Sequence, residues 1–162
     1  MTDFTHIDGE GRVRMVDVGD KKETKRTAAA SGSVYMNPET LDRIASSTVK
    51  KGNVFETARI AGVMAAKKTG DLIPMCHPLN LTHVQVDFEM DMENHLIRID
   101  AEASLTGRTG VEMEALVAVS TAALTIYDMC KSYDKGMRIS DIRLQSKTGG
   151  KSGDFKADDD KR

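Results

Sequence analysis

The chain has 162 residues, of which 40% are apolar and 30% charged, and its formal net charge is −2. This length predicts a single domain, residues 1–162, with a buried core. The lysines and arginines form small separate clusters rather than one polybasic surface, which argues against nucleic-acid binding. Two cysteines are too few for a disulfide scaffold and no charged-then-apolar leader begins the sequence, so we expect a soluble, cytoplasmic protein.

The amino-terminal third predicts an arm, a short strand and a helix. Residues 1 to about 31 show no sustained hydrophobic period and are expected to form a flexible arm. Residues 33–36 can form a short strand. Asn37-Pro38-Glu39 then supplies a helix N-cap, a proline at the first helical position and an acidic first turn, which predicts a helix to about Ser47.

A second helix is predicted from Asn53, where Glu56 three residues later resembles a capping box. Small residues recur every four positions along it, so another backbone can approach one face closely. They are Ala58, Gly62 and Ala66. Lys51 lies just before its amino end, where free N–H groups favour an anion. Lys51 is therefore either a phosphate-binding or acid–base group or an ordinary solvated lysine. The arm contains a basic cluster of Lys21, Lys25 and Arg26. These residues likewise either contact a ligand or are ordinary solvated side chains.

The next segment, residues 71–78, is a loop whose shape is restricted by Pro74 and Pro78. His77 between Cys76 and Pro78 is suited to hydrogen bonding or proton transfer near neutral pH, or it packs against the sheet edge. Adjacent cysteine and histidine lack the usual spacing of zinc ligands, so no metal site is expected here.

Strict alternation of apolar and polar residues over 84–92 and again over 97–105 predicts an antiparallel hairpin. A last strand is expected over 137–145, with Ser140-Asp141 as a bulge. Together with the helices, these segments predict an α+β fold: a ferredoxin-like β-α-β-β-α-β subunit whose antiparallel sheet carries its helices on one face.

The longest uncharged run, residues 115–127, predicts a buried helix over about 112–131 that is too short and too hydroxylated to span a membrane. At 1.5 Å per residue, Glu114 and Asp128 would lie roughly 21 Å apart and look outward in similar directions. One small substrate could hardly touch both in a single copy. Two such helices packed antiparallel about a two-fold axis would bring the Glu114 end beside the partner's Asp128 end, so we predict a site shared between subunits.

The carboxyl-terminal tail, residues 147–162, is rich in glycine and lysine and is expected to be mobile. Its backbone N–H groups, Lys147 and Lys151 could close over phosphates, or the tail is a solvated linker. It is not a P-loop, because Gln145 stands where that motif needs glycine and no apolar helix follows.

Four ordered motifs closely resemble those of the molybdenum cofactor biosynthesis protein C family: KGNVFETARIAGVMAAKKT, DLIPMCHPL, LTGRTGVEMEALVAVSTAALTIYDMCK and KTGGKSGDF. The resemblance runs over residues 4–156. It implies a cytoplasmic lyase, a cyclic pyranopterin monophosphate synthase, that acts as a homohexamer (a trimer of dimers) with sites at subunit interfaces. The implied substrate is 3′,8-cyclo-7,8-dihydro-GTP, made by the pathway's radical enzyme, and the products are cyclic pyranopterin monophosphate and pyrophosphate.

The resemblance also implies roles for individual residues. Asp128 is expected to be the acid/base, with Lys51 and Lys131 transferring protons and orienting phosphates, and His77 completes the catalytic set. The expected substrate-binding residues are Met75, Cys76, His77, Met113, Glu114, Glu112, Lys147 and Lys151.

The chemistry needs proton transfers and loss of pyrophosphate but no redox step, so no cofactor is required, although Mg²⁺ can accompany the triphosphate. Asp128 and Lys131, three apart on a helix, share a face, and a lysine near other cations can have its pKa lowered. Two alternatives from other classes are a non-catalytic nucleotide-binding module and a structural oligomer. Turnover of the cyclised dihydro-GTP would distinguish these three hypotheses.

Overall fold

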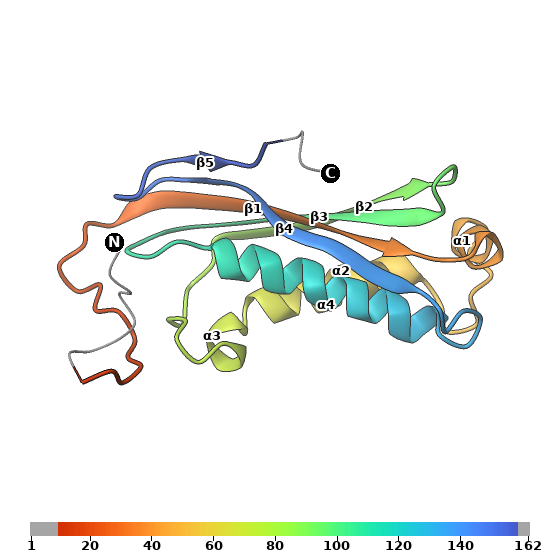
Figure 1. The fold of residues 1–162 in the computed structure, drawn as a ribbon, viewed down its shortest axis with the longest axis horizontal. Helices are drawn as coiled ribbons and strands as arrows, with labels where there is room; N and C mark the ends of the chain where they lie inside the picture. Colours follow the sequence, from red (N-terminus) through yellow and green to blue (C-terminus); the bar gives the residue numbers. More distant parts are fainter. Residues whose placement is uncertain (1–9, 159–162) are drawn as a thin grey trace.

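The computed structural model describes residues 10–158 and contains one antiparallel sheet with helices packed on it (Figure 1). The strands are β1 (Thr24–Tyr35), β2 (His83–Asp91), β3 (Leu96–Gly107), β4 (Arg138–Thr148) and β5 (Phe155–Lys156), in the spatial order β2-β3-β1-β4-β5. The helices are α1 (Pro38–Ala45), α2 (Val54–Ala66), α3 (Thr69–Leu72) and α4 (Glu112–Cys130). The α+β prediction is confirmed, and α2 and α4 provide the two crossovers of the expected β-α-β-β-α-β order.

The centre of the sheet is β1, which corrects the predicted arm. Residues 24–31 are not part of a loose arm, because β1 pairs with β3 on one side and with β4 on the other. Every second residue from Arg26 to Val34 is buried, but most of these are alanine or glycine, so the alternation lacks large apolar side chains. A Cβ on Gly32 would lie 2.8 Å from Val119 of α4, which explains why small residues are needed. Residues 1–9 of the predicted arm lie outside the described residues.

Helix α4 forms the core beneath the sheet. By length and composition α4 could span a membrane, but 56% of its apolar stretch is buried inside the protein, so α4 is a core helix. Helix α2 crosses it at Gly62, where an added Cβ would lie 3.0 Å from the Ala118 carbonyl oxygen. The predicted close approach of a backbone to this face is confirmed.

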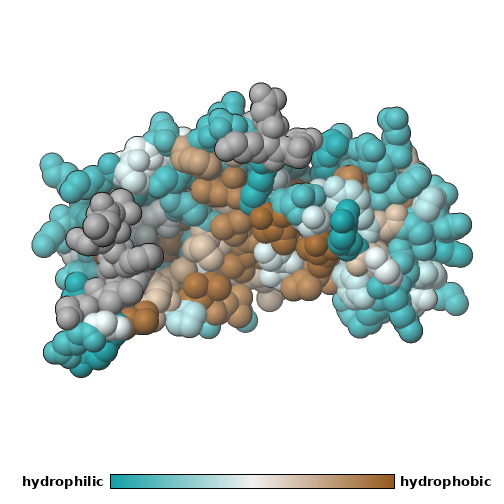
Figure 2. Space-filling model, in the orientation of Figure 1, coloured by the Kyte–Doolittle hydropathy of each residue, from teal (hydrophilic) through white to brown (hydrophobic). Residues whose placement is uncertain are grey.

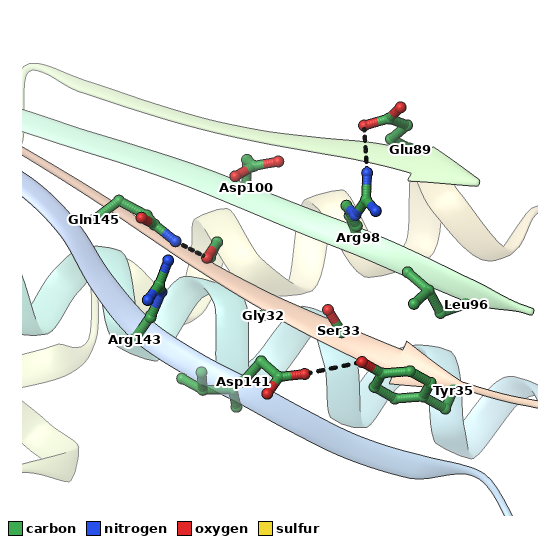
Figure 3. Close-up of a pocket in the computed structure, with 12 residues that line it drawn as sticks. Gly32, Ser33, Tyr35, Glu89, Leu96, Arg98, Asp100, Asp141, Arg143 and Gln145 are labelled. Atoms are coloured by element: carbon green, nitrogen blue, oxygen red, sulfur yellow. Dashed lines mark hydrogen bonds and ion pairs between the residues drawn. The ribbon is translucent and has the colours of Figure 1, made fainter. Parts of the chain in front are cut away.

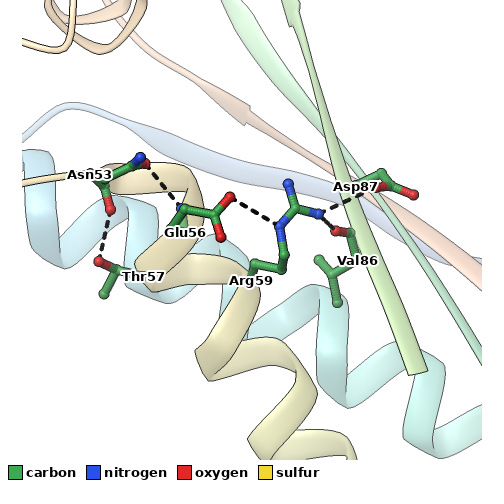
Figure 4. Close-up of polar contacts among 6 residues, drawn as sticks. All are labelled: Asn53, Glu56, Thr57, Arg59, Val86 and Asp87. Atoms are coloured by element: carbon green, nitrogen blue, oxygen red, sulfur yellow. Dashed lines mark hydrogen bonds and ion pairs between the residues drawn. The ribbon is translucent and has the colours of Figure 1, made fainter. Parts of the chain in front are cut away.

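The predicted helix caps are also present. The Asn37 side chain accepts a hydrogen bond from the Thr40 N–H at 2.8 Å, and Asn53 accepts one from the Glu56 N–H at 3.1 Å (Figure 4). Arg59 then ties α2 to β2, because its guanidinium donates to the Val86 carbonyl and contacts the Asp87 carboxylate at 3.2 Å. These bonds fix the direction in which α2 leaves the loop that carries Lys51.

The last strand is longer than predicted. Its pairing with β1 shifts register between Ser31 and Ser33, and Asp141 has a φ of 58°, so the predicted bulge at Ser140-Asp141 is confirmed. The strand continues to Thr148, and a turn then leads to β5, which pairs with β4. Gly149 needs to be glycine, because its φ is 85° and an added Cβ would meet the Lys25 carbonyl oxygen. Residues 147–156 therefore lie along the sheet edge, while 159–162 lie outside the described residues.

Candidate functional site

The carboxyl end of α4 carries a compact charged cluster of Asp128, Lys131 and Lys51. The Lys131 ammonium lies 2.7 Å from one Asp128 carboxylate oxygen, and the Lys51 ammonium lies 3.0 Å from the other. Lys51 also donates to the backbone carbonyl of Asp128 at 2.7 Å, one of the carbonyls left without a partner at a helix end. The loop before α2 and the end of α4 thus place two cations on one carboxylate.

Electrostatics in this cluster favour the ionised carboxylate. Hydrogen bonds and charge from Lys131 and then Lys51 lower the pKa of Asp128, and Asp128 in turn raises the pKa of Lys131. The expectation that neighbouring cations would lower a lysine pKa is therefore wrong for Lys131, because the carboxylate lies between the two ammonium groups. All three side chains are about half exposed, so a ligand can reach them.

The amino end of α4 carries a second cluster, built from β1, β4 and the loop before α4. Lys147 lies 3.1 Å from the Glu112 carboxylate and donates to the Ser152 hydroxyl at 2.7 Å. Arg26, only 9% exposed, donates to the carbonyls of Gly107 and Arg108 at 3.0 and 3.2 Å. Among Lys21, Lys25 and Arg26 of the predicted arm, Arg26 is the residue that the structure places in a candidate site.

Glu114 lies at the same end of α4, but its side chain does not have the predicted outward orientation. Its side chain is 3% exposed, so it does not look outward in the isolated chain. Burial, and secondarily the charge of Glu112, raise the pKa of Glu114 to about 7. Burial and then the charge of Glu114 raise the pKa of Cys76, which places the loop of residues 75–77 at this end of α4.

The predicted site residues therefore fall into two groups, one at each end of α4. The first contains Lys51, Asp128 and Lys131. The second contains Glu112, Glu114, Lys147, Cys76 and its neighbours Met75 and His77, with Met113 37% exposed beside them and Lys151 exposed in the turn before β5. Figure 1 shows α3 and the following loop where α4 begins, and α1 where α4 ends. The helical rise separates Glu114 from Asp128 by roughly 21 Å, and His77 lies with the Glu114 group.

Apolar side chains are exposed between these two ends. Leu124 of α4 is 60% exposed, and Ile60 and Met64 of α2 are 59% and 53% exposed. Figure 2 shows apolar atoms gathered over the middle of one side of the molecule, along which α4 runs in front of α2 (Figure 1). We call Ile60, Met64 and Leu124 the helical apolar surface.

A separate hollow of about 620 Å³ lies on the sheet face opposite the helices (Figure 3). Polar and charged side chains line most of it, including Ser31, Ser33, Arg98, Asp100 and Arg143. Burial, and then the charges of Glu89 and Asp87, raise the pKa of Asp100. None of the predicted site residues lines this hollow.

Within residues 10–158, no group of three or more histidine, cysteine, aspartate or glutamate side chains is arranged to hold a metal ion. Cys130, a free cysteine, is buried in the core. Burial raises its pKa to about 11, so it is a neutral core thiol at physiological pH.

Comparisons with known proteins cover nearly the whole chain. The MoaC family model matches residues 15–150. A cyclic pyranopterin monophosphate synthase of Desulforapulum autotrophicum is 73% identical over 158 residues, which span 98% of this chain and 97% of that protein. Synthases of the same name from Desulfatibacillum aliphaticivorans and a Roseiflexus species are 64% and 59% identical, each over 96% of this chain and 98% of the relative.

Proposed function

This chain belongs to the MoaC family and has the cyclic pyranopterin monophosphate synthase activity of molybdenum cofactor biosynthesis, and we propose that two copies of the chain build each catalytic centre. Such an activity implies a cyclic GTP-derived substrate. The substrate we propose is 3′,8-cyclo-7,8-dihydro-GTP, supplied by the pathway's radical enzyme, with cyclic pyranopterin monophosphate and pyrophosphate as products. We place the reaction in the cytoplasm.

The Asp128 cluster supplies the acid–base chemistry in this proposal. Asp128 is held ionised between two ammonium groups, so it can accept a proton, and Lys131 and Lys51 can donate one or bind a phosphate oxygen. Because the cluster is half exposed, an incoming phosphate can take over one lysine without leaving a buried charge unpaired. The single observation that supports these roles best is the convergence of both lysines on one carboxylate.

The second cluster holds the substrate. Arg26 and Lys147 bring positive charge to the turn between β4 and β5, where phosphates would lie, and Lys151 is exposed in the same turn. Glu114, with a pKa of about 7, can be a neutral carboxylic acid that both donates and accepts hydrogen bonds, which suits the edge of a purine or pterin ring. In this proposal Met75, Cys76, His77, Met113 and Glu112 also contact the substrate.

Two observations support a site shared between subunits. The two clusters stand at opposite ends of one continuous helix, roughly 21 Å apart along its axis, which is too far for a small substrate to join both. Between them lies the helical apolar surface, which an antiparallel copy of α2 and α4 would cover. A two-fold axis through this surface would place each Glu114 end beside the partner's Asp128 end. Three such pairs would form the expected homohexamer.

Direct turnover tests this function. Purified protein incubated with 3′,8-cyclo-7,8-dihydro-GTP should release cyclic pyranopterin monophosphate and pyrophosphate in equal amounts, with and without added Mg²⁺. The Asp128→Ala variant is the matched negative control, since Asp128 is exposed at a helix end. Binding of the nucleotide without any product would instead favour the non-catalytic binding module.

A further inference from the structure

The turn that follows α4 is bonded to two distant segments through neighbouring residues. The Tyr133 hydroxyl accepts a hydrogen bond from the Lys50 N–H at 3.0 Å, and the Asp134 carboxylate accepts one from the Asn37 N–H at 2.8 Å. Residues 50 and 37 flank α1 in sequence. This turn therefore fixes both ends of the α1 segment against the carboxyl end of α4.

The bond to Lys50 acts on the residue next to Lys51. Residues 49–52 form a tight turn in which the Gly52 N–H donates to the Val49 carbonyl at 3.0 Å and Gly52 has a φ of 106°. The Lys51 side chain is a flexible four-carbon stem, so the place of its ammonium depends on where this backbone turn is held. Tyr133 holds it one residue away from Lys51.

The Tyr133 ring is itself well fixed. Its backbone N–H donates to the Cys130 carbonyl at 2.8 Å, and its ring packs against the core. The Arg43 guanidinium lies 4.9 Å from the ring centroid, within the range of a cation–π contact. The ring contacts would survive loss of the hydroxyl, so the Lys50 bond can be removed alone.

We propose that Tyr133 is a positioning residue for catalysis: its hydroxyl holds the turn of residues 49–52 so that the Lys51 ammonium reaches Asp128 opposite Lys131. This inference rests on the proposed function of the Asp128 cluster. Tyr133 acts through Lys50 and Lys51 and needs no contact with the substrate.

The test compares Tyr133→Phe with Tyr35→Phe in the full-length protein. Tyr35 is a matched control, because its hydroxyl also makes one exposed hydrogen bond, to Asp141 at 3.1 Å, but on the opposite face of the sheet. Steady-state turnover gives kcat and KM, and deuterium exchange followed by mass spectrometry reports on the amides of residues 48–53. Lys51→Ala and the unmodified protein are measured in the same assay.

Tyr133→Phe should speed amide exchange in residues 48–53 and lower kcat by roughly fivefold, the equivalent of one ordinary hydrogen bond. KM and the thermal midpoint should match those of Tyr35→Phe. A kcat equal to that of Tyr35→Phe, or unchanged exchange, would overturn the positioning role. An active Lys51→Ala variant is a different result: it removes Lys51 from the catalytic set, and the role of Tyr133 with it.

Discussion

At the scale of single residues, the two carboxylates at the ends of α4 are tuned in opposite directions. Lys131 and Lys51 lower the pKa of Asp128, whereas burial raises the pKa of Glu114 to about 7. At neutral pH Asp128 is fully ionised while Glu114 is partly protonated. One helix therefore carries an ionised carboxylate at one end and a buried, partly protonated carboxyl group at the other.

The raised pKa of Glu114 predicts a pH dependence of folding stability. The unfolded chain releases this proton near its ordinary pKa of 4.5 and the folded chain only near 7, so stability falls as pH rises between those values and then levels off. The loss should reach about 3 kcal/mol. Urea unfolding at pH 5 and pH 7.5 should show most of this loss in the unmodified protein and none of it in Glu114→Gln. An equal loss of stability between these pH values in both proteins would contradict its assignment to Glu114.

The Asp128 cluster predicts loss of turnover without loss of folding. Lys51→Ala, Asp128→Ala and Lys131→Ala should each lower kcat by roughly 10²-fold or more, while their circular dichroism and thermal midpoints stay near normal, because these side chains are exposed. Lys135→Ala, an exposed lysine in the turn after α4, is the control and should retain activity. Near-normal turnover by any one of the three would remove that residue from the catalytic set.

At the scale of elements, residue patterns predicted those segments whose signals are local. The hairpin, both helix caps, α4 and the bulge follow from periodicity or from neighbouring residues. Most of β1 was missed because its buried side chains are mainly alanine and glycine, whose small size reflects the helix packed against them. Spacing on a helix also predicted the Asp128–Lys131 pair. It could not predict the Lys51–Asp128 contact or the Lys147–Glu112 contact, because folding alone brings these distant segments together.

The crossing of α2 and α4 depends on the absence of a side chain at Gly62. Gly62→Val should lower the free energy of unfolding by about 1–3 kcal/mol, because its methyl groups would meet the Ala118 carbonyl and Val86. Ala61→Val, at the adjacent partly buried position, controls for the lower helix propensity of valine. Equal urea midpoints for the two variants would show that α2 can move away from α4 at no cost.

At the scale of the whole molecule, the chain places its two charged clusters on either side of an apolar surface. A monomer would leave that surface in water and would keep the Asp128 cluster apart from the Glu114 cluster. The proposed assembly about a two-fold axis would cover the apolar surface and bring the two clusters together, which is why we link oligomerisation to activity.

This link predicts the effect of a charge on the helical apolar surface. Leu124→Glu places a carboxylate at a 60% exposed position on α4, so it should weaken assembly and lower turnover together. Light scattering after size-exclusion chromatography gives the mass. Met92→Glu, at a 47% exposed position by the β2–β3 turn, is the control and should change neither the mass nor the turnover. A Leu124→Glu protein with unchanged mass and full activity would place the interface elsewhere.

Complementation between inactive variants tests the shared site most directly. Glu114→Ala and Asp128→Ala subunits, carrying different affinity tags, are mixed, and the oligomers that contain both are isolated by two affinity steps. In each mixed pair one site has both defects and the other has neither, so random mixing should restore about a quarter of normal turnover. Complete absence of activity in verified mixed oligomers would contradict a site built from two copies of the chain.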